Sequence, residues 1–400
     1  MRGRNEGQSK MFYSINMESR IRADHPLRAI KKCVDAILKS MEPKFNAAYA
    51  KTGRPGVPPE RLLKSLLLMA LYTVRSERQL VERIDTDLLF RWFLDMDPAE
   101  PTFDATAFTH NRPRLDEHGL TAAFFTAVLE QAVEAGLVST EHFSVDGTLI
   151  ESYASLKSFQ PRQDANNSDR DDRHDEPSQD TDNQSKNAND GNSFKPSNPD
   201  VDFKGQKRSN DTHTSRTDSE AKLYRKGPGK EAKLAHMGHT LAENRHGLVV
   251  AISVSEASGT AEREAALDML EQVSKLDGVK VKTLGADRGY DSGQFCLDLE
   301  SHGVEPHVAL IETPPPRPEN IRKRYQNQFA ARERMKRRTS SDAYRASQKA
   351  RRKIEEAFGW MKSIGDLARS RFVGRWKLKQ QAEIAAAAFN LVRMRKLVPG

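Results

Sequence analysis

The sequence predicts an all-helical N-terminal domain over residues 1–138, followed by an α/β domain with a mixed sheet over residues 139–400. Between residues 20 and 138, apolar residues recur at helical spacing and are interrupted by Pro and Gly. After residue 139, helical segments alternate with β-type runs near residues 143, 236, 250, 281 and 306. The 400 residues are enough for roughly two or three domains of ~150 residues each.

Six helices account for the first domain. We expect them over residues 29–47, 62–72, 77–84, 87–93, 104–115 and 120–135. Pro58 and Pro59 suit the start of the second helix, because the missing N–H of proline would have no partner in a first turn. Ser76 is placed to cap the third helix, and Gly136 to end the last one.

The second domain begins with a predicted strand over residues 142–150. A hairpin follows, with strands 235–242 and 248–255 joined by the turn 243–247. The pattern then predicts a helix over 261–276, a strand over 279–284, a helix over 293–301 and a strand over 304–310. From residue 320 onward the pattern is helical and basic.

Residues 161–200 interrupt the α/β pattern. This stretch has no Leu, Ile, Val, Met, Tyr or Trp, and it holds 10 acidic residues against 5 basic ones. It cannot bury enough apolar area to offset the entropy that ordering would cost. We therefore predict a disordered insertion.

The charge is distributed unevenly. The whole chain has a net charge of +8, but residues 317–400 hold 23 Lys and Arg against 7 Asp and Glu. Basic triplets occur at 322–324, 336–338 and 351–353. Such clusters attract phosphate backbones through counterion release, so this C-terminal part predicts contact with nucleic acid, with Arg337 and Arg338 as candidates. The simpler alternative is a solvated helical surface.

Several protein classes do not fit the composition. Two cysteines, Cys33 and Cys296, cannot form a disulfide scaffold or a four-thiolate zinc site. The start of the chain lacks an apolar signal segment, and the longest apolar stretch is much shorter than the ~20 residues of a membrane span. We therefore expect an intracellular, soluble protein without a membrane partner.

Three acidic residues are the candidate catalytic groups. Asp146 and Asp287 follow two predicted strand segments, and Glu355 lies in a basic helix; the spacings are 141 and 68 residues. Carboxylates at strand ends, with one from a helix, are able to hold two Mg²⁺ ions about 4 Å apart for phosphoryl transfer. Each residue also has a simpler interpretation, as a turn, a cap, or an ion pair of Glu355 with Arg351.

Four stretches resemble one protein family. Residues 53–115, Val145-Asp146-Gly147-Thr148, residues 285–292 around Asp287, and residues 352–362 around Glu355 resemble the DDE transposases of bacterial insertion sequences. The resemblance is to the broad group of insertion sequences four, five and eleven-eighty-two. It covers roughly residues 50–155 and 205–395. Glu355 is preferred over the adjacent Glu356 because Phe358 follows it at the offset of the family motif.

The resemblance implies an RNase H-like catalytic domain that cleaves transposon ends and joins them to target DNA. It implies Asp146, Asp287 and Glu355 as ligands of two Mg²⁺ or Mn²⁺ ions. Arg352 and Lys362 share the helix face of Glu355 and are candidate DNA contacts. The implied partners are double-stranded DNA, as terminal inverted repeats and target, and a second copy in an active homodimer. The implied location is the bacterial cytoplasm, at the nucleoid.

Three alternatives remain open at this point. An RNase H-like nuclease without strand transfer would use the same carboxylates. A non-catalytic DNA-binding regulator would use a helix-turn-helix between residues 60 and 84, although no turn glycine occurs there. A zinc hydrolase would need His236 and His239, but no cysteine or carboxylate pair completes such a site. Tyr290 is expected either to stack on a base or to pack in the core.

Overall fold

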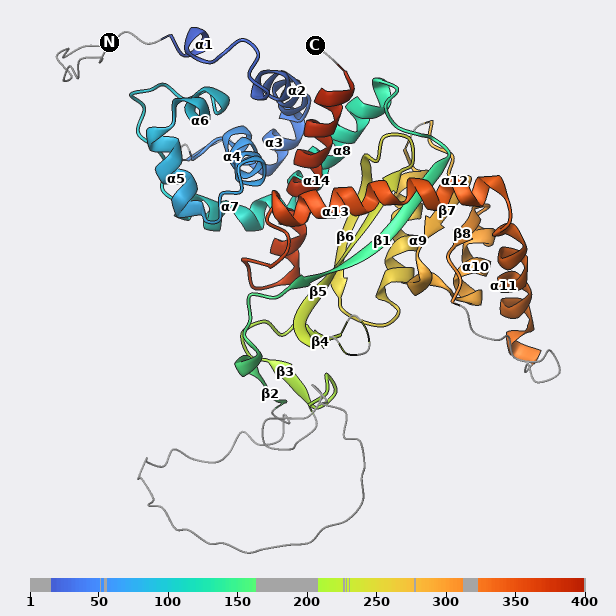
Figure 1. The fold of residues 1–400 in the computed structure, drawn as a ribbon. Helices are drawn as coiled ribbons and strands as arrows, with labels where there is room; N and C mark the ends of the chain where they lie inside the picture. Colours follow the sequence, from blue (N-terminus) through green and yellow to red (C-terminus); the bar gives the residue numbers. More distant parts are fainter. Residues whose placement is uncertain are drawn as a thin grey trace, which may run out of the picture.

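The computed structural model describes residues 16–50, 52–53, 56–162, 208–225, 227, 229, 231–276, 278–311 and 323–398. All but the first two residues of the predicted insertion, 161–200, therefore lie outside the described residues. The described chain has a helical N-terminal region and a mixed sheet covered by helices (Figure 1). Among the described helices, none is both long and apolar enough to cross a membrane.

Eight helices lie in the described part of the helical region, between residues 16 and 138. They are α1 (Met17–Arg20), α2 (Leu27–Ser40), α3 (Glu42–Ala48), α4 (Pro59–Leu71), α5 (Glu77–Thr86), α6 (Leu88–Phe93), α7 (Thr106–Glu117) and α8 (Leu120–Glu134). The Ser76 side chain caps α5 by accepting from Gln79 N. The single helix expected over 29–47 is instead two helices, because Pro43 has no N–H to continue a ladder and starts α3.

The sheet has five main strands in the spatial order β6-β5-β1-β7-β8. They are β1 (His142–Glu151), β5 (Lys233–Glu243), β6 (Val249–Glu256), β7 (Thr283–Ala286) and β8 (Glu305–Val308). β5 is antiparallel to both β1 and β6, whereas β1, β7 and β8 run parallel. Three antiparallel strands followed by two parallel ones form the RNase H-like sheet, so the predicted fold class is confirmed.

Short strands extend this framework. β4 (Lys222–Tyr224) pairs with the start of β5, and β2 (Phe159–Pro161) pairs with β3 (His213–Ser215) in a separate ribbon. The sequence did not predict these strands, because three residues are too few to show a period-2 pattern. The strand expected over 279–284 is also displaced, and β7 is formed by the four buried residues Thr283–Ala286.

Helices cover both faces of the sheet. α9 (Ala261–Ser274) packs on β1, β5 and β6, and α10 (Gly293–Ser301) and α11 (Gln326–Arg338) pack against each other and β8. On the other face, α12 (Asp342–Ala350) lies on β1, β7 and β8, and α13 (Arg352–Ser363) lies on β1 and β5. α12 and α13 follow one another across the sheet in front of β1 (Figure 1).

The last helix, α14 (Arg375–Leu397), joins the two regions. It contacts α2, α4, α7 and α8 of the helical region as well as β6 of the sheet. The buried Asn390 side chain accepts from Val249 N at 2.9 Å and donates to Val249 O at 2.8 Å, which completes the start of β6. The residues from 375 to 397 therefore belong to a core that is shared with the N-terminal helices.

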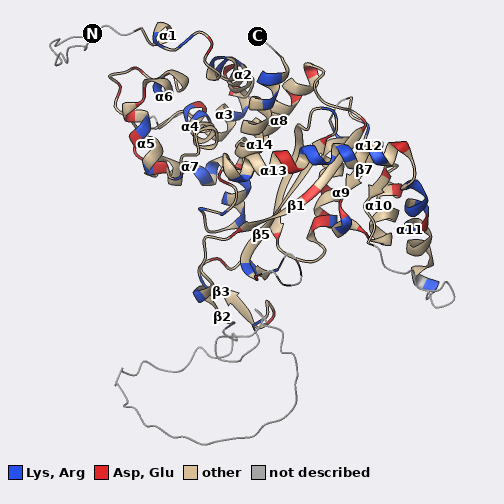
Figure 2. Cartoon of the chain, viewed as in Figure 1, with Lys and Arg blue, Asp and Glu red and all other residues tan. Residues whose placement is uncertain are grey.

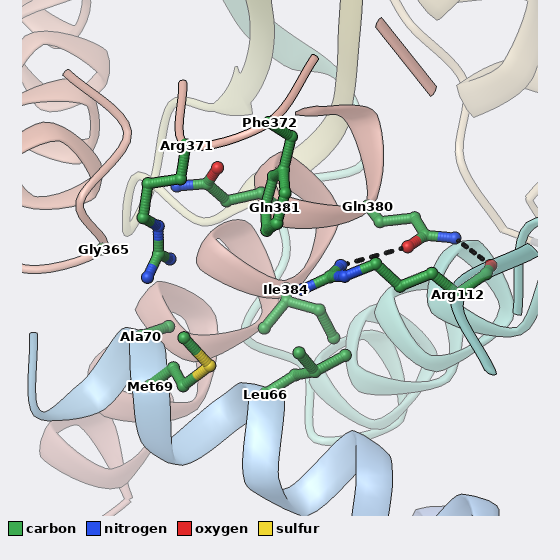
Figure 3. Close-up of a pocket in the computed structure, with 10 residues that line it drawn as sticks. All are labelled: Leu66, Met69, Ala70, Arg112, Gly365, Arg371, Phe372, Gln380, Gln381 and Ile384. Carbon is green, nitrogen blue, oxygen red and sulfur yellow. Dashed lines mark hydrogen bonds between the residues drawn. The ribbon is translucent and has the colours of Figure 1, made fainter. Parts of the chain in front are cut away.

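Figure 3 shows this junction around a cavity of about 20 Å³ between α4, α7 and α14. Arg112 donates to Gln380 Oε1 at 3.3 Å, and Gln380 Nε2 donates back to Arg112 O at 3.0 Å. Glu77 also accepts from the Arg112 guanidinium at 2.5 Å. A buried Arg whose donors are paired in this way fixes the helical region on α14.

The zinc alternative finds no support in the fold. His236 Nε2 lies 2.9 Å from Asp218 Oδ2, and His239 Nε2 lies 2.7 Å from Ser255 Oγ. Both histidines are buried in the sheet, and desolvation lowers the pKa of His239 to about 4. The Nε2 atom of each ring is thus paired within the fold, whereas Nδ1 of each has no hydrogen-bond partner among the described residues.

Candidate active site

The sheet places the two predicted aspartates on neighbouring parallel strands, but Asp146 lies in the middle of β1 and not at its end as predicted. Ser144 of β1 is paired with Gly285 of β7, and Asp146 and Asp287 each lie two residues farther along. Adjacent strands are about 4.8 Å apart, so the two carboxylates start from neighbouring backbone positions. The 141 residues between them in sequence do not separate them in space.

Asp287 lies where β7 ends and a turn of 3₁₀ helix, η2 (Arg288–Tyr290), begins. Its Oδ1 accepts from Gly289 N at 2.8 Å, which caps the turn. One oxygen of the Asp287 carboxylate thereby holds the turn in place. The simpler interpretation of Asp287 as a cap is therefore correct for this oxygen.

Glu355 is positioned by the apolar side of α13. Ile354, Ala357, Phe358 and Met361 are all buried, at the i, i+3, i+4 and i+7 spacing of one helix face. Glu355 lies beside this face, and its side chain is 54% exposed.

Arg351 connects the helix to the first strand. Its Nη2 donates to Glu355 Oε1 at 2.9 Å, and its Nη1 lies 3.8 Å from Asp146 Oδ2. One guanidinium thus lies between two carboxylates that are 209 residues apart in sequence. The ion pair between Arg351 and Glu355, which was the simpler interpretation of Glu355, does form. It lies beside Asp146, because the same guanidinium contacts both carboxylates.

Glu356 points elsewhere. Its Oε1 accepts from Arg393 Nη1 of α14 at 2.8 Å. Neighbouring positions on a helix differ by about 100° in direction, which separates the two glutamates. Only Glu355 shares a cation with Asp146 among the described contacts of these two residues.

A further carboxylate, Glu262 in the first turn of α9, reaches Gly147 of β1 and the turn after β7 from the other face. A Cβ on Gly147 would lie 2.5 Å from Glu262 Oε1, and a Cβ on Gly289 would lie 3.0 Å from both Glu262 Oε2 and Asp287 Oδ1. The sequence analysis missed this residue. In the sequence, Glu262 is only an acidic residue in the first turn of a helix between two strands that carry motifs. Many solvated helices have such a residue, so the pattern does not single it out.

Tyr290 lies beneath these carboxylates and is fully buried. Its ring packs on Phe295 with centroids 5.6 Å apart, so the expectation that it stacks on a base does not fit its position. Burial raises the pKa of Tyr290 well above its ordinary value, and the charges of Glu262, Asp146 and Asp287 raise it further. Its hydroxyl has no hydrogen-bond partner among the described residues.

The residues suit a divalent cation by type. Carboxylate oxygens are the hard donors that Mg²⁺ and Mn²⁺ prefer, and the buried Tyr290 hydroxyl is an orphaned polar group beside them. Within the described part of the chain, however, no three His, Cys, Asp or Glu side chains are already close enough to hold an ion. The Arg351 guanidinium lies between Asp146 and Glu355, in the position where positive charge is needed.

The predicted DNA-contact residues differ in their surroundings. Arg352 and Arg337 are exposed, and Lys362 is half-buried on α13. Arg338 is bound to the fold, because its guanidinium lies 3.0 Å from Glu300 Oε1 and 3.5 Å from Glu305 Oε1. Figure 2 shows basic and acidic residues side by side along α13 where it crosses β1.

Two family models match the chain. One describes a transposase domain of the DUF772 type and matches residues 15–114; the other describes a transposase DDE domain and matches residues 202–391. Asp287 and Glu355 lie within the second match, whereas Asp146 lies outside both.

A solved structure titled "Crystal structure of a pre-cleavage Mos1 transpososome" aligns over 81% of this chain and 84% of that one, at 9% identity and a TM-score of 0.20. A TM-score this low does not establish a shared arrangement. No curated protein matches the chain significantly. The two family models cover both structural regions, and the chain belongs to the DDE transposases of insertion sequences.

Proposed function

We propose that Asp146, Asp287 and Glu355 are the metal-binding carboxylates with which this transposase cleaves DNA at the ends of its element and transfers the strands. The observation that carries the proposal is the single guanidinium of Arg351, which contacts both Asp146 and Glu355. Asp287 joins them through the β1–β7 register. Three carboxylates from distant parts of the chain thus lie near the middle of β1 and the end of β7.

Two Mg²⁺ or Mn²⁺ ions are the proposed cofactors. When bound, such ions stabilise the negative charge that develops on the attacking and leaving oxygens of a phosphodiester. The middle of β1 and the end of β7 supply two carboxylates next to a rigid backbone ladder, and α13 supplies the third. Arg351 offsets part of the negative charge of Asp146 and Glu355 and keeps them near each other before the cations arrive.

The test compares the amide variants Asp146→Asn, Asp287→Asn and Glu355→Gln on a labelled DNA that carries the element end. Each substitution keeps the shape and removes one charge, so we expect the fold to survive and both cleavage and strand transfer to fail. Thermal unfolding of each variant checks the fold. Full cleavage by any of the three would remove that residue from the site. Cleavage without strand transfer by the unaltered protein would instead favour the nuclease alternative.

Double-stranded DNA is the proposed partner, bound as terminal inverted repeats and as target. Arg352, Lys362 and Arg337 are the proposed contacts, because they lie on α13 and α11 outside the apolar faces of these helices. End pairing requires two copies of the enzyme, so we expect a homodimer on paired ends. Light scattering of the protein with an end duplex tests this, and one copy per two duplexes would contradict it.

A further inference from the structure

Glu262 approaches the proposed metal site from the face of the sheet opposite to Glu355. Successive strand residues point to opposite faces, and Asp146 contacts Arg351 at the start of α13 while Gly147 faces Glu262 of α9. The two helices that carry glutamates therefore lie on the two sides of β1, as Figure 1 shows for α9 and α13.

The first turn of α9 is fastened to the loop that carries Asp287. Arg263 Nη1 donates to Gly289 O at 3.2 Å, in the turn that Asp287 caps. Glu262 Oε2 and Asp287 Oδ1 each lie 3.0 Å from the same point, the position of a Cβ on Gly289. The two oxygens are consequently within about 6 Å of each other.

Glycine at positions 147 and 289 leaves the room that Glu262 occupies. A side chain at Gly147 would meet three atoms of Glu262, at 2.5, 2.8 and 2.9 Å. Neither glycine has a positive φ, so backbone conformation does not require glycine at either position. In this arrangement the Glu262 carboxylate occupies the space that a Cβ at Gly147 would take, and at Gly289 the Glu262 and Asp287 carboxylates share that space.

The orphaned hydroxyl of Tyr290 is the second, independent observation. It is fully buried, it lacks a hydrogen-bond partner among the described residues, and it lies in the field of Glu262, Asp146 and Asp287. A buried hydroxyl without a partner is unfavourable, and this one lies next to the carboxylates of the proposed site. Water bound to a cation among the carboxylates would donate a hydrogen bond to this hydroxyl oxygen.

We propose that Glu262 is a fourth carboxylate of the proposed metal site and binds a divalent cation together with Asp287. An ion with oxygen ligands at about 2.1 Å needs the two oxygens within about 4.2 Å of each other. A change of rotamer in the flexible Glu262 side chain covers the remaining distance, which is at most about 2 Å. This inference rests on the proposed function, because it assigns Asp287 to the same ion.

The experiment measures Mn²⁺ binding by the full-length protein without DNA, from the loss of the free Mn²⁺ signal in electron paramagnetic resonance. Glu262→Gln should raise the Mn²⁺ dissociation constant tenfold or more, as the loss of groups around a metal commonly does. Glu264→Gln is the matched control. Glu264 is exposed in the same first turn and shares any favourable interaction with the helix dipole. Its dissociation constant should stay within about twofold.

Gly147→Ala provides a second variant that retains Glu262. The added methyl group displaces the flexible carboxylate, so we expect weaker Mn²⁺ binding and no additional loss when it is combined with Glu262→Gln. If Glu262→Gln bound Mn²⁺ as tightly as the parent and Asp287→Asn bound it weakly, the inference about Glu262 would be overturned and the proposed site would stand. Unchanged affinity in Asp287→Asn as well would overturn the proposed site itself.

Discussion

The strand-borne carboxylates and the helix-borne carboxylate of this transposase are held by different forces. Asp146 lies within β1 and Asp287 directly after β7, two strands whose backbones pair at Ser144 and Gly285, so hydrogen bonds of the sheet set their separation. Glu355 is placed by the packing of α13 on β1 and β5 and by one ion pair with Arg351. The aspartates therefore depend on register, and the glutamate depends on apolar packing.

This difference indicates which of the three carboxylates is able to shift its position. A strand pair cannot shift by less than a register step without losing its ladder. A docked helix is able to move by fractions of an ångström as side chains repack around it. We therefore expect the two aspartates to define the site and α13 to complete it.

Asp287→Asn should produce the largest effect on activity. It removes one charge from a rigid position, and we expect cleavage to fall by roughly a thousandfold or more because metal-held charges supply most of the transition-state stabilisation. The melting temperature should stay nearly unchanged. Single-turnover cleavage of an end duplex measures the effect, and activity within tenfold of the parent would contradict the role of the strand ends.

The glutamate pair sharpens the comparison on the helix. Glu355→Gln should reduce cleavage by a factor close to that of Asp287→Asn, whereas Glu356→Gln should change it by less than about threefold. Glu356 serves as the control because it is adjacent, exposed and bound to Arg393. Equal losses in the two variants would show that α13 presents a different face in the active enzyme.

Met361→Ala tests the packing that holds α13. The side chain is fully buried, so truncation should lower the free energy of unfolding by about 2–5 kcal/mol. Cleavage should also fall at temperatures where the variant is folded, because Glu355 is then held less firmly. Leu80→Ala in α5, which is equally buried, should cost similar stability in urea denaturation but leave cleavage by the folded protein intact.

Two adjacent arginines of α11 extend the comparison to DNA. Arg337→Gln should lower the slope of log affinity against log salt by roughly one unit, because an exposed cation that contacts phosphate releases a counterion. Arg338→Gln should change the slope less, since its guanidinium is bound to Glu300 and Glu305. Binding titrations between low and moderate salt measure both slopes. Equal slopes for Arg337→Gln and the parent would place Arg337 away from DNA.

Deletion of residues 165–198 should have the smallest effect. The composition of this segment cannot support a core, and register alone sets the aspartate pair on either side of it. We expect a nearly unchanged melting temperature in a thermal scan. A loss of several degrees would show that this stretch contributes ordered structure.

Much of the fold was predictable because it depends on local patterns. α10 has the predicted bounds, and β1, α4, α5 and α8 agree with their predictions to within a few residues. The short strands β2, β3 and β4 and the break at Met41 were missed, since three-residue strands and a single proline leave weak periodic signals. The candidate carboxylates were found through motifs at strand ends, but Glu262 belongs to no such motif.

Sequence alone determined the helical and α/β halves, the family, and the aspartates after two strand-forming runs, because these follow from periodicity and short motifs. The tertiary structure decided which cations and carboxylates meet. Arg351 reaches Asp146, Glu356 turns to Arg393, and the basic helix α14 becomes a core element rather than a surface. These outcomes depend on the packing of segments that are far apart in the chain, and no local pattern of residues encodes such contacts.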